Sequence, residues 1–459
     1  MKKPRGQSIS VVVLILLAAA AFLLFFVPVN PQLKALLLFT IAAGIFFIAF
    51  IDTDLALIIL IFSMLLSPEF RTGDIPGRSV VIRAEDVLLF IVFFGWVSKT
   101  AINKDLGLLR KTALNAPIFF YLLICILSSL ISVLTRVNLA RISFFHLLKY
   151  LEYFLLYFLV VNNLRTKEQA RRFVFFLLAT CMIVSAWAIF QIPGGERLSA
   201  PFEGKGGEPN TFAGYLLLMI ALITGLLVFS ETLTARLAYA GMMCVALVTF
   251  VFTLSRGGWL GFFPMILIFL LLGRRMKIPL ILILLAGIIA LPSVIPRKAQ
   301  DRFHATFNPE KTVDILGKEY TIAESAAARI ESWGVAFEKL RQRPLFGHGV
   351  PSGWTVDSQY TRVLGEVGLL GFAVFVWMLT VLFRCGLRTY RAVRDDPFAE
   401  GVALGFIAGL SGLVVMGFSA AVFIIIRIME PFWFLAAIVV ALPELEGVKR
   451  RVVLAEDNT

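Results

Sequence analysis

Polar residues that could perform chemistry gather at two places in a chain that is otherwise strongly apolar. The first is the segment LSRGGW at 254–259, where one apolar run ends and the next begins. A guanidinium is a planar fork of donors that fits phosphate oxygens, and glycines let a ligand or a second backbone come close. Arg256 is therefore a candidate for binding a phosphate-bearing substrate. The alternative is an arginine that extends to the lipid headgroups.

The second place begins at Asp357 and ends in the pair Gly368 and Gly371. Asp357 precedes an apolar run, and a carboxylate near such low-dielectric surroundings can accept a proton from a hydroxyl. A compatible alternative is that Asp357 or Ser358 caps the following helix. Glu366 lies about two turns into that run and is costly there unless it faces a polar interior.

Four further residues are weaker candidates, each with an ordinary alternative. His348 lies between two glycines and could act as a base or simply be a turn residue. Arg197 and Lys205 lie in a glycine-rich segment, where they could attract an anionic ligand or be solvated. Arg329 lies on a predicted surface helix, and an arginine in that position is by itself expected to be solvated.

The composition predicts a polytopic helical membrane protein. Hydrophobic residues make up 59% of the 459 residues and charged residues 16%, whereas soluble proteins carry about 25% charged residues. Apolar runs of about 15 to 25 residues recur, which is long enough to cross a bilayer. Because lipid offers no partner for backbone polar groups, these runs must be helices.

The basic residues cluster in short loops at alternate turns of the chain, which is typical of cytoplasmic loops. This distribution explains the net charge of +13 without a nucleic-acid partner. It predicts that both termini are cytoplasmic and that the first run is a retained signal anchor. The predicted spans are 9–27, 32–51, 54–66, 87–101, 116–135, 144–161, 173–190, 210–230, 236–254, 257–273, 278–294, 360–384, 399–420 and 424–443. These are about 14 spans, or 12 if the pair interrupted by Asp52 and Asp54 is re-entrant or interfacial.

Four segments fall on the outer side in this topology: 67–86, 135–141, 191–210 and 295–359. The last is too long to lack secondary structure, and it predicts an amphipathic helix at Thr321–Arg341, on the membrane surface over the mouth of the bundle. The chain then divides into a helix bundle at 1–294, a large extracytoplasmic loop at 295–359, and C-terminal helices with a tail at 360–459. The scattered cysteines indicate neither a zinc site nor a disulfide framework, and no metal or cofactor is expected.

Several of these pieces occur in a fixed order along the chain. They are Arg197, PNTFAGY at 209–215, SRGG at 255–258, Arg329 with Trp333, Pro344 with GHG at 347–349, and the segment that opens at Asp357. The ordered set resembles the O-antigen ligase and O-antigen polymerase superfamily of bacterial envelope glycosyltransferases.

The resemblance implies a GT-C-like, metal-independent enzyme of the bacterial cytoplasmic membrane with an extracytoplasmic active site. Such enzymes transfer a glycan from a polyprenyl-diphosphate carrier to an acceptor hydroxyl, on the lipid A core in ligases and on the next repeat unit in polymerases. Two family arginines that bind the diphosphate match Arg256 and Arg329, and Arg197 or Lys205 would assist them. The resemblance also leaves room for a chain-length regulator as a partner.

One departure from the ligase pattern bears on the activity. Ligases have a histidine where this chain has Asp357, although Ser358 and the Gly368 and Gly371 pair match. A polymerase-like or other transferase member is therefore favoured over a strict ligase. The rivals are a lipid-linked oligosaccharide flippase or transporter, a peptidoglycan polymerase, and a membrane scaffold. A transporter predicts paired halves and broken helices at mid-membrane. The sequence indicates neither feature, and a scaffold would leave the ordered motifs unexplained.

Overall fold

The protein is seen here in a computed structural model. It describes residues 31–67, 69–75, 78–102, 110–194, 197–203, 207–273, 311–315, 318–322, 324–351 and 358–445, with the backbone alone for 31–39, 69–82 and 311–332. The α-helices are α2 (Pro31–Ile51), α3 (Thr53–Leu66), α4 (Ala84–Ile102), α5 (Asn115–Leu134), α6 (Ala140–Asn163), α7 (Lys167–Ile189), α8 (Pro209–Phe229), α9 (Leu233–Phe252), α10 (Arg256–Leu272), α13 (Glu324–Gln342), α14 (Gln359–Ala392), α15 (Pro397–Met416) and α16 (Ile426–Leu445). Two 3₁₀ turns, η1 (Ile192–Gly194) and η2 (Val422–Ile424), and two hairpins, β1 (Glu69–Ile75) with β2 (Arg78–Arg83) and β3 (Lys311–Ile315) with β4 (Lys318–Ile322), complete the described elements.

The predicted helical membrane fold is confirmed. Each predicted span that falls on described residues coincides with a helix, while the spans predicted at 9–27 and 278–294 lie outside those residues. Within the described part, eight helices are long and apolar enough to cross a membrane, and three shorter apolar helices accompany them. The protein is therefore a polytopic helical membrane protein.

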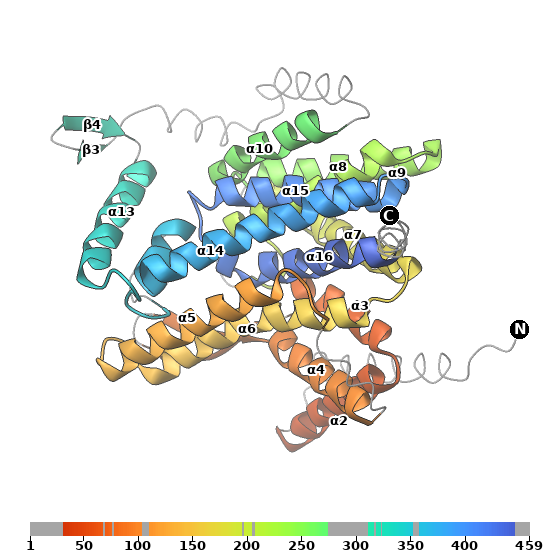
Figure 1. The fold of residues 1–459 in the computed structure, drawn as a ribbon, viewed down its shortest axis with the longest axis horizontal. Helices are drawn as coiled ribbons and strands as arrows, with labels where there is room; N and C mark the ends of the chain where they lie inside the picture. The colour runs from red at the N-terminus through yellow and green to blue at the C-terminus, as the bar shows by residue number, and fades with distance from the viewer. Residues whose placement is uncertain are drawn as a thin grey trace, which may run out of the picture.

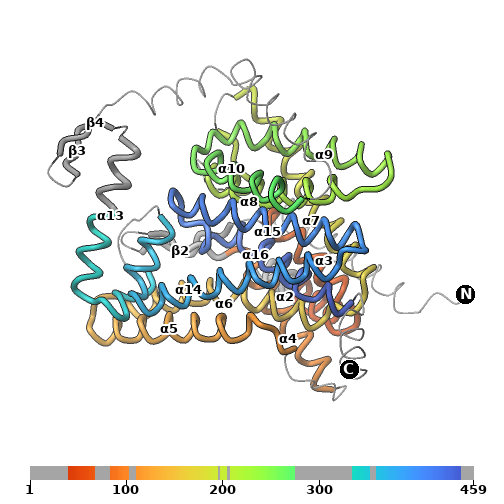
Figure 2. Tube along the Cα trace, turned by 45° about the horizontal axis from the view of Figure 1, so that its top comes forward, coloured from red at the N-terminus to blue at the C-terminus, as the bar shows by residue number. Residues whose placement is uncertain are grey.

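Most of the long helices lie side by side in one bundle, with α2 and α4 at an angle to it (Figure 1). Helices α8, α10, α14 and α16 all begin at the same end, which also holds the segments 197–203 and 417–425; we call this the motif end. Helix α13 lies beside the first part of α14 and runs crosswise to the bundle there (Figures 1 and 2). It coincides with the helix predicted at 321–341.

Glycines hold α8, α10 and α15 close together. A Cβ on Gly225 of α8 would collide with the Gly401 carbonyl of α15 and lie 3.0 Å from the Gly405 nitrogen. A Cβ on Gly261 of α10 would lie 2.6 Å from the Gly412 carbonyl oxygen of α15. Small residues permit such close backbone approach, which favours helix association in lipid. These three helices form the scaffold that carries the motif end.

Ion pairs and helix caps order the opposite end of the bundle, where the basic clusters were predicted. Lys167 pairs with Asp396, and Asp396 also caps α15 by accepting from the nitrogens of its first turn. Arg110 pairs with Glu444, the two residues lying on segments far apart in sequence. Side-chain caps satisfy backbone donors that a helix start leaves without a partner.

Two hairpins were not predicted. The pair β1 and β2 lies within the segment 67–86, and β3 and β4 within the segment 295–359. Both segments are polar and short between their turns, so periodicity gives a weak signal for strands there.

Candidate functional site

Three sequence motifs meet at the motif end through a shared asparagine. The side-chain oxygen of Asn210, in the first turn of α8, accepts from Arg197 Nη2 at 3.2 Å and from Ser255 Oγ at 2.9 Å. Arg197 Nε also donates to the Thr253 carbonyl at 3.0 Å. Ser255 in turn caps α10 by accepting from the Gly258 nitrogen at 3.3 Å. The pieces at 197, 209–215 and 255–258 therefore form one hydrogen-bonded unit.

Arg256 is the first residue of α10 and sits, half-buried, directly beside this unit. The starts of α8 and α10 lie at the same end, and helix N-termini favour negative charge. The two glycines after Arg256 pack against protein: a Cβ on Gly257 would collide with Ser419 Oγ, and one on Gly258 would lie 3.1 Å from Ala213 Cβ. Both glycines thus lie in close contact with side chains of neighbouring segments, and neither approaches a second backbone as expected.

The segment 417–419, between α15 and η2, links the start of α10 to the start of α14. Ser419 lies against Gly257, while the Gly417 carbonyl accepts from the Gln359 nitrogen at 2.8 Å and from Ser358 Oγ at 3.4 Å. Ser358 makes no side-chain cap bond to α14, so the prediction that its hydroxyl caps this helix is wrong. The Gly417 carbonyl is the acceptor that takes the hydroxyl instead.

Three of the predicted site residues cannot be placed as side chains. Asp357 and Lys205 lie outside the described residues. Arg329 lies on α13, of which the backbone is described at that position. The described neighbour of Asp357, Ser358, is fully buried at the motif end.

Helix α14 is broken at Gly368, where φ is +65° and ψ is −165°. The turn 344–349 fills the break: the Leu369 nitrogen donates to the Pro344 carbonyl at 2.8 Å, and the Gly349 nitrogen donates to the Glu366 carbonyl at 2.9 Å. Ser128 of α5 donates to the same Glu366 carbonyl at 2.7 Å. The Gly368 motif and the glycine–histidine–glycine turn are therefore two halves of one clasp. The sequence analysis did not predict this break, because turn and helix complement each other only in three dimensions.

His348 belongs to this clasp. Its backbone nitrogen donates to the Gly365 carbonyl at 2.9 Å, and its ring nitrogen Nε2 lies 3.0 Å from the Lys339 carbonyl. Burial lowers the pKa of the imidazole below its ordinary value. A neutral ring that donates to a backbone carbonyl is the arrangement of a turn residue that stabilises its own segment.

Glu366 faces a polar interior, as its position in an apolar span requires. Its carboxylate accepts from Arg362 Nε at 2.9 Å and from the Tyr150 hydroxyl at 3.2 Å. Glu366 is 1% exposed, and the two partners compensate its burial. Glu366 therefore forms a buried ion pair within α14 that is also hydrogen-bonded to α6.

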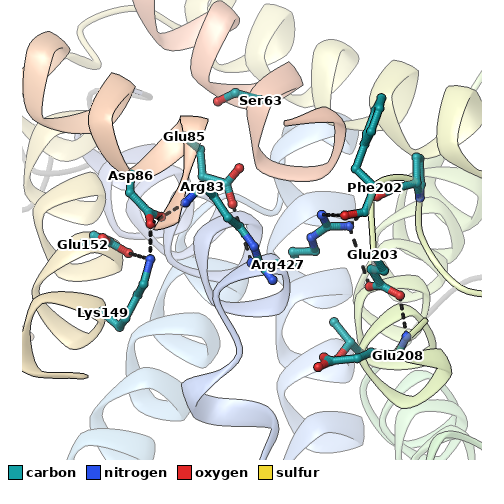
Figure 3. A network of polar contacts seen from close by, with 12 residues as sticks. Ser63, Arg83, Glu85, Asp86, Lys149, Glu152, Phe202, Glu203, Glu208 and Arg427 are labelled. Carbon is teal, nitrogen blue, oxygen red and sulfur yellow. Dashed lines mark hydrogen bonds and ion pairs between the residues drawn. The ribbon is translucent and has the colours of Figure 1, made fainter. Parts of the chain in front are cut away.

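A second polar network, which the sequence motifs did not indicate, runs across the motif end (Figure 3). Asp86 pairs with Lys149, and Lys149 lies 3.4 Å from Glu152. On the other side, Arg427 Nη1 lies 3.7 Å from Glu203 Oε1. The charged members are Arg83, Glu85, Asp86, Lys149, Glu152, Glu203, Arg427 and Glu430.

The network holds more acids than bases. The eight charged members named above comprise five carboxylates and three cations, and the oxygens Glu85 Oε2 and Glu430 Oε2 have no hydrogen-bond partner among the described residues. Charged residues within membrane spans are energetically costly and usually functional. Lys149, Glu152 and Arg427 lie within predicted spans, so the sequence could have marked them as candidates on this ground. Within the described residues, no three His, Cys, Asp or Glu side chains are placed to hold one metal ion.

The family comparison agrees with the motifs. Residues 241–376 match the family described as O-antigen ligase, a range that includes α10, α13, the turn 344–349 and the break in α14. No curated protein is similar enough to the chain to match it. The apolar helices and this family together indicate a bacterial inner-membrane protein. The match at 241–376 confirms the chain's resemblance to the O-antigen ligase and polymerase superfamily over that range.

Proposed function

We propose that the protein transfers a glycan from a polyprenyl-diphosphate carrier to an acceptor hydroxyl, with the motif end facing the outside of the cytoplasmic membrane. The reaction is of the polysaccharide polymerase or O-antigen ligase type and needs no metal. The lipid tail of the carrier lies between spans, and its sugar reaches the motif end.

One observation carries this proposal: motif residues that are far apart in sequence converge at the motif end. Arg197, Asn210 and Ser255 form one hydrogen-bonded unit beside Arg256. The segment 417–419 then joins this unit to the residues that follow Asp357. A scaffold or a set of unrelated surface loops would not require this convergence.

The proposed mechanism is a direct displacement. The acceptor oxygen bonds to the anomeric carbon while the bond from that carbon to the diphosphate oxygen breaks, which inverts the configuration. Arg256 and Arg329, with Arg197 or Lys205, neutralise the charge that develops on the leaving diphosphate, as preorganised electrostatic stabilisation. Asp357 takes the proton of the acceptor hydroxyl.

The proposal is tested by two alanine variants and two matched controls. Arg256→Ala and Asp357→Ala are expected to abolish the glycan product in cells while the protein still inserts into the membrane. Arg394 and Asp395 are exposed at the opposite end of the bundle, so Arg394→Ala and Asp395→Ala should leave the product unchanged. Normal product from either Arg256→Ala or Asp357→Ala would overturn the assignment.

A further inference from the structure

The network at the motif end contains an arginine whose guanidinium donates to backbone carbonyls and does not reach solvent or lipid. Arg427, in the first turn of α16, is 0% exposed. Its Nη1 donates to the Pro201 carbonyl at 2.6 Å, and its Nη2 lies 3.5 Å from the Phe202 carbonyl oxygen. The same guanidinium faces Glu203 at 3.7 Å (Figure 3). One side chain thus contacts three consecutive residues of the segment 197–203.

The segment 197–203 depends on contacts of this kind for its position, because it contains no helix or strand. Its first part is held by Arg197 at the Thr253 carbonyl and by the Leu198 nitrogen, which donates to the Phe252 carbonyl at 3.2 Å. Its last part turns at Phe202, whose φ of +59° is unfavourable for a residue with a side chain. A strained residue persists only where its surroundings fix it, and the contacts from Arg427 do so here.

The charges around Arg427 suit this role. A guanidinium taken fully out of water is costly unless it is paired and hydrogen-bonded. Glu203 lies on one side of it, and Glu85 lies within electrostatic reach on the other side. The guanidinium stays charged in its buried position, and its hydrogen bonds to the Pro201 and Phe202 carbonyls, together with the nearby Glu203, offset the cost of that burial.

We infer that Arg427 is a positioning residue, which fixes the segment 197–203 and through it orients Arg197 beside Arg256. The inference rests on the proposed function for the role of Arg197 as a ligand of the donor diphosphate, whereas the fastening of the segment is independent of it. Lysine at 427 would keep the charge opposite Glu203, but it lacks the planar fork that contacts two carbonyls at once.

The fastening is tested without any activity measurement. The full chain, with Cys125, Cys181, Cys244 and Cys385 replaced by alanine, carries Ala200→Cys, because Ala200 is buried within the segment. A membrane-impermeant maleimide should label this thiol about tenfold faster or more in Arg427→Gln, the factor expected for loss of one charge-assisted hydrogen bond. Arg427→Lys should lie between this variant and the parent. Arg394→Gln, at the opposite end, should match the parent.

The consequence for Arg197 is tested by kinetics with a polyprenyl-diphosphate-linked oligosaccharide. Arg427→Lys should raise the KM for the donor several-fold with a smaller change in kcat, because the competent position of Arg197 is less populated. A general structural defect would instead reduce the amount of monodisperse protein. Unchanged labelling in both Arg427 variants would overturn the inference. A parent protein that transfers no glycan would overturn the proposed function and leave the labelling test valid.

Discussion

Replacing Gly368 tests whether the break in α14 and the turn 344–349 form one structural unit. Gly368 has a backbone conformation that is essentially restricted to glycine. A Cβ there would lie 2.8 Å from the Gly347 nitrogen and collide with the Leu345 carbonyl, both of which are backbone groups of the turn 344–349. Gly368→Ala should therefore push the turn out of the break.

The expected cost follows from two effects. The strained φ and ψ cost about 1–3 kcal/mol, and overpacking against backbone costs about 1–3 kcal/mol more. The sum is about 2–6 kcal/mol, and a cost of about 3 kcal/mol, in the lower half of that range, already corresponds to roughly a 100-fold increase in local opening. The amides of Leu369 and Gly349, which bond across the break, should lose their protection first.

Hydrogen–deuterium exchange of the purified protein measures this opening directly. Peptides that cover 344–350 and 365–371 should exchange faster in Gly368→Ala, while peptides from α8 should not change. Gly241→Ala is the matched control, because a Cβ at Gly241 would meet no atom within 4 Å. Equal exchange of the clasp peptides in Gly368→Ala and Gly241→Ala would refute the idea that the turn and the break form one unit.

Three further predictions concern buried charge, pH and packing. Arg362→Met and Glu366→Leu should each lower the free energy of unfolding by about 3–5 kcal/mol, because each leaves one buried charge without its partner. The double variant should recover most of this loss. Thermal unfolding in detergent measures the effect, and a double variant no more stable than the single variants would contradict the prediction. Burial raises the pKa of Glu203 from 4.5 to about 7, so closure of its segment is most favoured below pH 4.5 and loses that advantage as pH rises through 7. Labelling of Ala200→Cys, corrected with an exposed reference cysteine, should increase over this range and stay flat in Glu203→Gln; a parallel rise in both would argue against Glu203. Gly225→Ala should cost about 1–3 kcal/mol by forcing α8 away from α15, and unchanged thermal stability would contradict the glycine contact.

The charged groups near Glu203 come from three elements and set the sign of this pH effect. Arg427 of α16 lowers its pKa, Glu208 lowers it by a backbone hydrogen bond and raises it by charge, and Arg83 lowers it. Burial outweighs these groups, so the closed segment holds a proton that a solvated carboxyl would release between pH 4.5 and 7.

The bounds of the helices could be predicted closely, because a backbone segment in lipid must satisfy its own hydrogen bonds and therefore forms a helix. The predicted span 210–230 is α8 at 209–229, and 257–273 is α10 at 256–272. The helix at 321–341 was also predictable, since its apolar residues recur at helical spacing. These are local properties, and a single sequence contains them in full.

The arrangement of the site could be predicted only in part. Arg197 and Arg256 were singled out by residue type, but their junction through Asn210 depends on how α8 and α10 pack. The break at Gly368 depends on a turn about twenty residues earlier that supplies its hydrogen-bond partners. The position of Arg427 within an apolar span could have marked it as a candidate, but its role could not be predicted, because its partners are backbone carbonyls more than two hundred residues away.

The most direct test of the proposed function is glycan transfer by the purified protein in liposomes. The substrate is a polyprenyl-diphosphate-linked oligosaccharide, alone and with a lipid A core acceptor, and mass spectrometry follows the lipid products. We expect carrier-linked glycans to lengthen or the acceptor to gain the glycan, and Arg256→Ala to abolish this transfer. Movement of the labelled lipid across the bilayer, without transfer to any acceptor, would contradict the transferase and indicate a flippase.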